Sequence, residues 1–302
     1  MKYPKRPYSI DEQLDLLEER GMIIENRKSA GHFLATHNYY RFSGYALHFE
    51  IFENRKRTHK FIPGTKFNDA IRIYEFDVKL RNLIFQAVKE IEIAFRTQLC
   101  LILANKYKDS HWYLRKDIYD SSFPFDKFIE DCRNETERSR EIFIKHYLDK
   151  YDDPALPASW MLIEIMTFGK WSMVYGKLKY KEDRKEIAAF FNVKEQFLSS
   201  WVQCLSFIRN LFSHHSRIWN KNFPFVPNQK REYNSILIGS DRIGNYLCVI
   251  HDLMLSISPE YKFFDKVKSL IDSYPEIPID RMGLKQGWDK PELWQFNKLS
   301  NK

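Results

Sequence analysis

The residues best suited to chemistry lie in one segment, residues 209–217, whose sequence is RNLFSHHSR. A histidine titrates near neutral pH and can transfer protons, and an arginine offers a fixed, positively charged fork to phosphate oxygens. RNA cleavage without a metal requires removal of the 2′-hydroxyl proton, stabilisation of the charged phosphorane and protonation of the leaving 5′-oxygen. The segment carries residue types for these tasks, and the products would be a 2′,3′-cyclic phosphate and a 5′-hydroxyl.

On a helix that turns by about 100° per residue, the polar side chains of this segment share one face. Relative to Arg209, the residues Ser213, Arg217, Asn210 and His214 fall at roughly 40°, 80°, 100° and 140°. We predict that His214 transfers the proton and that Arg209 binds the phosphate oxygens. Asn210 would orient His214 or the scissile phosphate, while Arg217, with Ser213 beside it, would contact RNA at an adjacent phosphate.

The opposite face of the same helix is apolar, which predicts packing into a core. The apolar side chains on this face are Trp201, Cys204, Leu205, Ile208, Leu211, Phe212, Ile218 and Trp219. His215 falls among them, so we expect it to be structural and to differ in role from the adjacent His214.

The spacing from Arg209 to His214 is weak evidence when it is taken alone. Similar spacings join Arg27 to His32, Arg41 to His48 and Arg140 to His146. The 209–217 segment differs because an asparagine directly follows its arginine and because the segment ends a strongly amphipathic stretch. The alternative interpretation is that Asn210 and His214 only satisfy neighbouring polar groups at a helix terminus.

A long helix is also predicted earlier in the chain. Apolar residues recur at three- and four-residue steps from Phe67 to about Lys106, which is typical of one buried face. Glu92 and Arg96 lie one turn apart on this helix. They form either an ordinary surface ion pair or a support that reaches the polar strip of the later helix.

The remaining sequence also favours helices and gives no period-two strand pattern, so the predicted class is all-α. Further helices are expected at 10–20, capped by Ser9, and at 126–148, 157–179, 194–220, 241–257 and 259–274. Residues 223–227 must be extended around their two prolines. The aromatic segment 38–45 is expected to dock on the body of the protein. The basic run 55–57 is expected to be a surface turn, with RNA contact as the alternative.

Composition restricts the class of protein further. The chain has 302 residues, 44% of them hydrophobic, and a formal net charge of +8, which favours a polyanionic partner such as RNA. The four cysteines lie far apart, so no zinc site or disulfide framework is expected. No metal or cofactor is predicted. An apolar leader and a membrane-spanning stretch are not indicated, so a soluble, unprocessed, cytoplasmic protein is expected.

Several segments together resemble a known family. The 209–217 segment with Trp219 and Asn220 looks like the signature helix of Abi-type abortive infection proteins of the AbiD/AbiF group, which are themselves similar to the HEPN superfamily of α-helical RNases. The resemblance spans about residues 9–260. The other segments that carry it are Asn38-Tyr39-Tyr40-Arg41-Phe42-Ser43-Gly44-Tyr45, Tyr74-Glu75-Phe76-Asp77-x-x-Leu80-Arg81, Ile91-Glu92-x-Ala94-x-Arg96 and Glu164-x-x-x-Phe168-Gly169-x-Trp171.

The resemblance implies an antiphage, toxin-like endoribonuclease on a HEPN-like helical bundle. The core would span residues 63–258, with an N-terminal helical and aromatic extension at 1–62 and a C-terminal helix and irregular tail at 259–302. Relatives pair two signature helices, so a homodimer with a composite site is expected. The substrate would be RNA, for which a small regulatory RNA is one candidate, and whether an antitoxin exists stays open.

Two alternatives to an enzyme remain at this point. The polar strip would bind RNA without cutting it in a scaffold or an inhibited toxin. In a protein-interaction module, exposed aromatic residues such as Trp288 and Trp294 would bind a partner chain.

Overall fold

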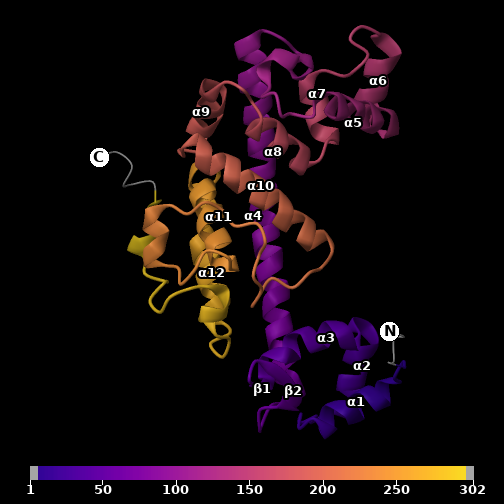
Figure 1. Ribbon diagram of the computed structural model, residues 1–302, viewed down its shortest axis with the longest axis vertical. Coiled ribbons are helices and arrows are strands. Elements are labelled where there is room, and N and C mark those ends of the chain that lie inside the picture. Colours follow the sequence, from indigo (N-terminus) through magenta and orange to yellow (C-terminus); the bar gives the residue numbers. More distant parts are fainter. Residues whose placement is uncertain (1–5, 297–302) are drawn as a thin grey trace. The chain divides into compact units, whose positions relative to one another are not determined.

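The computed structural model describes residues 6–296 and is mostly helical, which confirms the all-α prediction. Figure 1 shows the elements along the chain. They form two compact units: one holds the chain up to residue 80 together with 270–277, and the other holds 81–269 together with the chain from 278. The three-part division expected from the sequence stays a prediction, since compactness does not report which parts fold independently.

The first unit contains short helices, a hairpin and the beginning of the long helix α4. Its elements are α1 (Ile10–Glu19), α2 (Arg27–His37), α3 (Tyr39–Ala46), η1 (Leu47–Phe49), β1 (Glu50–Glu53), β2 (Lys56–Phe61) and the first part of α4 (Phe67–Tyr107). Ser9 caps α1, and a reciprocal capping box with Glu12 satisfies two backbone donors at the start of the helix. The helix predicted at 10–20 is therefore confirmed.

The aromatic segment 38–45 forms α3. Phe42 and Tyr45 are buried, as docking predicted, whereas Tyr40 is 87% exposed. Tyr45 donates a 2.8 Å hydrogen bond from its hydroxyl to the carboxylate of Asp77 on α4, within the same unit. The segment therefore anchors α3 to the long helix, as the concentration of aromatic residues indicated.

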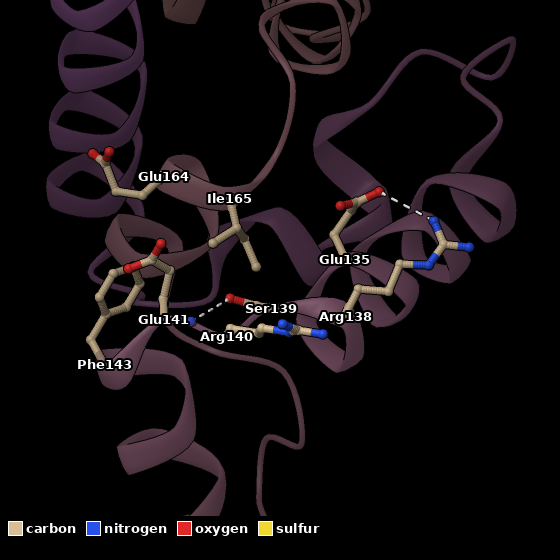
Figure 2. A pocket seen from close by; sticks show the side chains of 8 residues that line it. All are labelled: Glu135, Arg138, Ser139, Arg140, Glu141, Phe143, Glu164 and Ile165. Atoms are coloured by element: carbon tan, nitrogen blue, oxygen red, sulfur yellow. Dashed lines mark hydrogen bonds and ion pairs between the residues drawn. The ribbon is translucent and has the colours of Figure 1, made fainter.

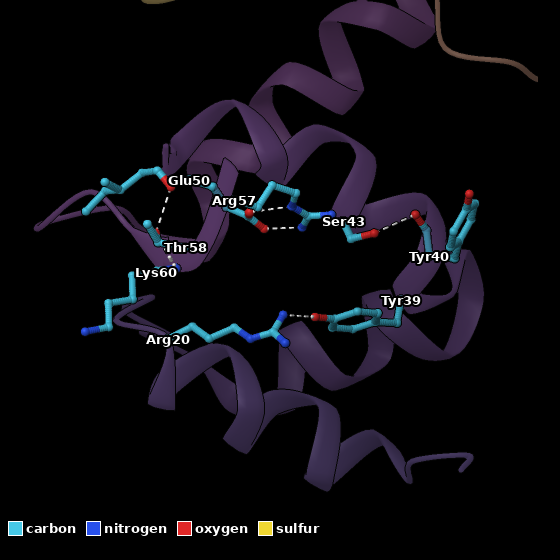
Figure 3. Close-up of polar contacts among 9 residues, drawn as sticks. Arg20, Tyr39, Tyr40, Ser43, Glu50, Arg57, Thr58 and Lys60 are labelled. Atoms are coloured by element: carbon cyan, nitrogen blue, oxygen red, sulfur yellow. Dashed lines mark hydrogen bonds and ion pairs between the residues drawn. The ribbon is translucent and has the colours of Figure 1, made fainter. Parts of the chain in front are cut away.

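The basic run 55–57, which was expected to be a surface turn, is exposed at the end of the antiparallel hairpin of β1 and β2: Arg55 lies in the turn, whereas Lys56 and Arg57 begin β2. Asn54 and Arg55 both adopt positive φ in the connection, a conformation that tight two-residue hairpins require. Arg57, which pairs with Phe52 in the register, donates a 2.7 Å hydrogen bond from Nε to the carboxylate of Glu50 on β1. In Figure 3, Arg20 also donates to the hydroxyl of Tyr39, at 3.2 Å. No glycine marks the turn, which is why the sequence did not reveal the hairpin.

The second unit contains the helices that build the candidate site. They are the later part of α4, α5 (Phe125–Arg138), α6 (Ile142–Lys150), α7 (Ser159–Ile165), α8 (Phe168–Gly176), α9 (Lys181–Phe190), α10 (Glu195–Ser213), α11 (Ile243–Ile257) and the first part of α12 (Phe263–Asp272). Short 3-10 turns connect them: η2 (Trp112–Leu114), η3 (Lys116–Ile118), η4 (Arg231–Ser235), η5 (Pro259–Tyr261), η6 (Ile279–Met282) and η7 (Pro291–Trp294).

Two of the predicted helices are each divided in the structure. The stretch 126–148 forms α5 and α6, separated at 139–141, and the stretch 157–179 forms α7 and α8. The second division occurs at Thr167, whose hydroxyl caps α8 by accepting from the backbone N–H of Lys170. A side chain that bonds to the backbone competes with helix continuation, and apolar periodicity does not report that competition.

The core of the second unit is built around α4. Its inward stripe is fully buried and consists of Ile84, Ala87, Val88, Ile91, Phe95, Leu99 and Leu103. Phe95 packs its ring against Phe168 and Tyr175 of α8, with ring centroids 5.9 and 5.6 Å away. Phe85 meets Phe212 of α10 at 5.9 Å. The periodicity predicted one buried face on this helix, and the structure shows that α8 and α10 pack on it.

The expectation that Trp288 and Trp294 are exposed is wrong. Their exposed fractions are 4% and 2%, because Trp294 packs against the buried His251 of α11 and Trp288 packs against Trp294. The indole N–H of Trp294 donates to the backbone oxygen of Trp288 at 2.7 Å. The chain near 288–296 therefore belongs to the core of the second unit, and the aromatic docking surface loses its basis.

None of the helices within residues 6–296 combines the length and the apolar character needed to cross a bilayer. The four cysteines are buried and unpaired with one another.

Candidate functional site

Helix α10 carries the start of the candidate segment and ends before its histidines. The predicted helix continued to residue 220, but α10 ends at Ser213 and His214 is its C-cap. The N–H of Ser216 donates to the oxygen of Leu211 at 3.0 Å, and the N–H of His215 donates to that of Phe212 at 2.9 Å. This pair of bonds is a Schellman closure, in which one residue adopts a left-handed conformation.

His215 is that left-handed residue, with φ of 52°. Its side chain is exposed, so the expectation that it packs in the apolar face is wrong. The helical wheel fails here because the chain leaves the helix one residue earlier. For the same reason Arg217, which is partly exposed, does not lie on the helix, although Ile218 and Trp219 still reach the core.

Arg209 lies on the last turns of α10 and is held by α4. Its Nε lies 3.6 Å from Oε2 of Glu92, whose side chain is only 9% exposed, whereas the Arg209 side chain is 39% exposed. The other oxygen of Glu92 pairs with Arg96 one turn along α4. One buried carboxylate therefore binds two guanidinium groups, and the group of Arg209 is the one that reaches solvent.

Arg96 is the buried member of this cluster. Desolvation is the main cause that lowers its pKa, Glu92 and Glu164 oppose this effect, and Arg209 adds to it. Its terminal nitrogen donates to the backbone oxygen of Met166 at 3.0 Å, which ties the cluster to the chain that leads into α8. An arginine remains charged at any ordinary pH, so two positive charges face the single carboxylate of Glu92.

Asn210, Ser213 and His214 are all exposed. The backbone N–H of His214 donates to the oxygen of Asn210 at 3.3 Å, so the two residues are adjacent at the end of the helix. The hydroxyl of Ser213 is bonded to the backbone oxygen of Arg209 at 3.4 Å. The predicted site residues Arg209, Asn210, Ser213 and His214 therefore lie together, and Glu92 and Arg96 lie behind Arg209.

Two hollows adjoin this cluster. A groove of about 530 Å³ runs between α8 and α10 and includes Asn210 in its lining. A second hollow lies where α5 turns into α6, and its lining includes Glu164 of α7, which also acts electrostatically on Arg96 (Figure 2). Sequence reasoning missed both hollows and the effect of Glu164. The only available signal was the segment 164–171, which carried part of the family resemblance without an assigned role.

No group of three or more His, Cys, Asp or Glu side chains within residues 6–296 is arranged to hold a metal ion.

A family model described as "Abi-like protein" matches residues 32–220, which is more than half of the chain. The chain therefore belongs to the Abi-like protein family, and the resemblance to Abi-type proteins is confirmed, whereas the relation to the HEPN superfamily stays a prediction. Membership indicates a role in abortive infection defence. No curated protein matches the chain. No solved structure matches it either.

Proposed function

We propose that this protein is a metal-independent endoribonuclease of abortive infection that cleaves RNA by attack of the 2′-hydroxyl. The observation that carries the proposal is the position of Arg209, which a buried carboxylate holds next to an exposed histidine. Glu92 restrains Arg209 from behind, while the exposed part of the guanidinium remains available to a phosphate. His214 follows directly after the helix and is accessible to a substrate.

In the proposed reaction, His214 removes the proton of the 2′-hydroxyl. The 2′-oxygen then forms a bond to phosphorus, and the bond from phosphorus to the 5′-oxygen breaks. Arg209 stabilises the charge on the phosphorane oxygens, since its fork matches their geometry. Asn210 orients the phosphate, and Arg217, with Ser213, binds RNA at a neighbouring nucleotide. Glu92 and Arg96 act as positioning residues for Arg209.

The leaving 5′-oxygen needs a proton, and one chain provides one histidine in the proposed site. A second copy of the chain would supply another His214, so the proposal includes a homodimer with a composite site. In each cleavage, the His214 of one chain would act as the base, and the His214 of the other chain would act as the acid that protonates the leaving 5′-oxygen.

The proposal is tested by incubation of the purified protein with total RNA in EDTA, followed by analysis of the fragment ends. We expect 2′,3′-cyclic phosphate and 5′-hydroxyl ends, no cleavage of DNA, and no cleavage where the scissile nucleotide lacks its 2′-hydroxyl. Fragments with 3′-hydroxyl and 5′-phosphate ends would contradict the proposed chemistry.

A non-catalytic RNA-binding role is the second candidate. It is favoured by the single histidine that one chain contributes to the proposed site, and by the net charge of +8. RNA affinity that falls steeply with salt, together with intact RNA after long incubation with wild-type protein, would establish this candidate over the nuclease.

A further inference from the structure

The groove between α8 and α10 has the chemistry of a base-binding site. Its walls include the rings of Phe207 and Phe225, whose centroids lie 4.8 Å apart. The side-chain amides of Gln203 and Asn210 line the same groove. An aromatic wall beside amide groups is the combination that proteins use to stack and read an unpaired base.

Small residues on α8 keep the groove open. Gly169 and Gly176 are two turns apart and line the groove on the same side of their helix. A Cβ at Gly176 would lie 3.3 Å from the hydroxyl oxygen of Ser199, so glycine allows the close approach of α10 at that point. A Cβ at Gly169 would be 3.9 Å from the hydroxyl oxygen of Ser206, which is an ordinary van der Waals distance, so a side chain at Gly169 would be tolerated and a large one would occupy the groove. These glycines therefore do more than weaken α8.

The polar groups of the groove are available for a ligand. Within the described residues, the side-chain amides of Gln203 and Asn210 make no hydrogen bond, and both residues are exposed. Each amide offers a donor pair and an acceptor, which suits the Watson–Crick edge of a base. Phe225 is 44% exposed and presents its ring to solvent.

The position and charge of the groove favour RNA over a neutral peptide. Asn210 belongs to both the groove and the proposed catalytic cluster, so a nucleotide in the groove would lie next to the scissile phosphate. Lys177 also lines the groove, and it lines a neighbouring hollow in which the cations Lys177, Lys179 and Arg184 outnumber the carboxylates Asp120 and Glu195. A strand that continued from the groove would meet these cations, and its phosphates would be attracted to them. The volume of about 530 Å³ lies in the range of pockets that bind small molecules.

We infer that the α8–α10 groove binds one unpaired base of the RNA strand, stacked on Phe225 and contacted by Gln203 and Asn210. The inference rests on the proposed function, because it treats the groove as the subsite that selects the nucleotide beside the cleavage point. Binding and cleavage can be measured separately, so the two proposals can fail separately.

The test measures the Kd of 2′-fluoro pentanucleotides, which cannot be cleaved through the 2′-oxygen, with a central A, C, G, U or abasic position. For the wild type, we expect the best base to bind roughly tenfold more tightly than the abasic pentanucleotide, since stacking on an aromatic residue is of that order. Phe225→Ala should lose this preference, and Phe225→Trp should retain it. Phe52→Ala is the matched control, because Phe52 is 49% exposed on β1 in the other unit.

A second variant removes the dependence on Phe225, which also packs on Phe207. Gly169→Leu should fill the groove and remove the preference for a base, while Phe225, Gln203 and Asn210 are all kept. Melting temperatures of all variants identify any that fail to fold.

If Phe225→Ala weakens the binding of the abasic pentanucleotide and of the best pentanucleotide equally, the inference is wrong. It is also wrong if the wild type binds the abasic pentanucleotide as tightly as the others, or binds none of them. If none binds and α8 becomes protected from hydrogen exchange when the protein self-associates, the groove belongs to a protein interface.

Cleavage of total RNA by the same preparations separates this inference from the proposed function. Cleavage with no nucleotide preference, and with the same pattern in Gly169→Leu, would leave the nuclease intact and overturn the base site. Base-dependent binding without cleavage would support the groove and contradict the nuclease.

Discussion

Glu92 of α4 and Arg209 of α10 form an ion pair in which the carboxylate is buried and the guanidinium is partly exposed, with 3.6 Å between Oε2 and Nε. Glu92 also binds Arg96, which is mostly buried. The pair therefore links the core of the second unit to the surface that carries Asn210 and His214. A buried charge that loses its partner lowers the free energy of unfolding, so substitution of Glu92 tests directly how Arg209 is positioned.

Glu92→Gln should lower both stability and activity. The substitution leaves Arg96 without its carboxylate in a buried position, and we expect the free energy of unfolding to fall by about 1–3 kcal/mol. Arg209 would lose its restraint, so kcat for RNA cleavage should fall more than KM rises. Urea denaturation and steady-state cleavage check the two effects.

The matched control is Glu90→Gln, since Glu90 lies on the same helix and is exposed. It should leave stability and cleavage close to those of the wild type. Equal behaviour of the two variants would mean that Glu92 does not position Arg209.

The sequence predicted the helical class and the long helix α4, because apolar residues repeat over many turns and that signal is strong. For Glu92 and Arg96 it left two interpretations open, a surface ion pair or a support for the later helix. The end of α10 could not be predicted, because the left-handed residue that closes the helix is His215 and no glycine marks the position. The α8–α10 groove depends on how closely two helices approach, and this property belongs to packing between segments. The role of Gly169 and Gly176 was therefore visible only in three dimensions.

The two adjacent histidines should differ in function. His214→Ala should abolish cleavage and growth inhibition while the melting temperature changes little, since the side chain is exposed. His215→Asn should remain active, because asparagine tolerates the left-handed conformation that this position requires. Loss of cleavage in His215→Asn, with a wild-type melting temperature, would transfer the proton-transfer role to His215.

Mixed subunits test the composite site. Arg209→Ala and His214→Ala homodimers should each be inactive, whereas mixing them after subunit exchange should restore part of the activity in heterodimers. Sedimentation of the wild type should show a dimer. A monomer with full activity, or mixtures that stay inactive despite verified exchange, would show that each site is complete within one chain.

Stability should fall as the pH is lowered below about 6.5, and His251 should account for part of this fall. Burial lowers the pKa of His251, while its hydrogen bond to the backbone oxygen of Trp294 and the nearby Asp265 oppose the shift. Below the ordinary histidine pKa, the unfolded chain binds a proton that the folded protein does not bind at this site. The free energy of unfolding therefore decreases as the pH is lowered, by up to about 1.4 kcal/mol per pH unit for one such group.

His251→Phe keeps a ring among Trp294, Phe264 and Phe296 and removes the titration. The variant loses the hydrogen bond to Trp294, so its stability at pH 7 should be lower than that of the wild type. The informative quantity is therefore the slope of the free energy of unfolding against pH. Urea unfolding between pH 5 and 7 should give a shallower slope for His251→Phe than for the wild type.

Burial also lowers the pKa of His111, so this residue should supply part of the remaining slope. His146→Gln, at an exposed position, serves as the control and should keep the wild-type slope. An unchanged slope in His251→Phe would mean that the folded protein protonates His251 as readily as the unfolded chain does.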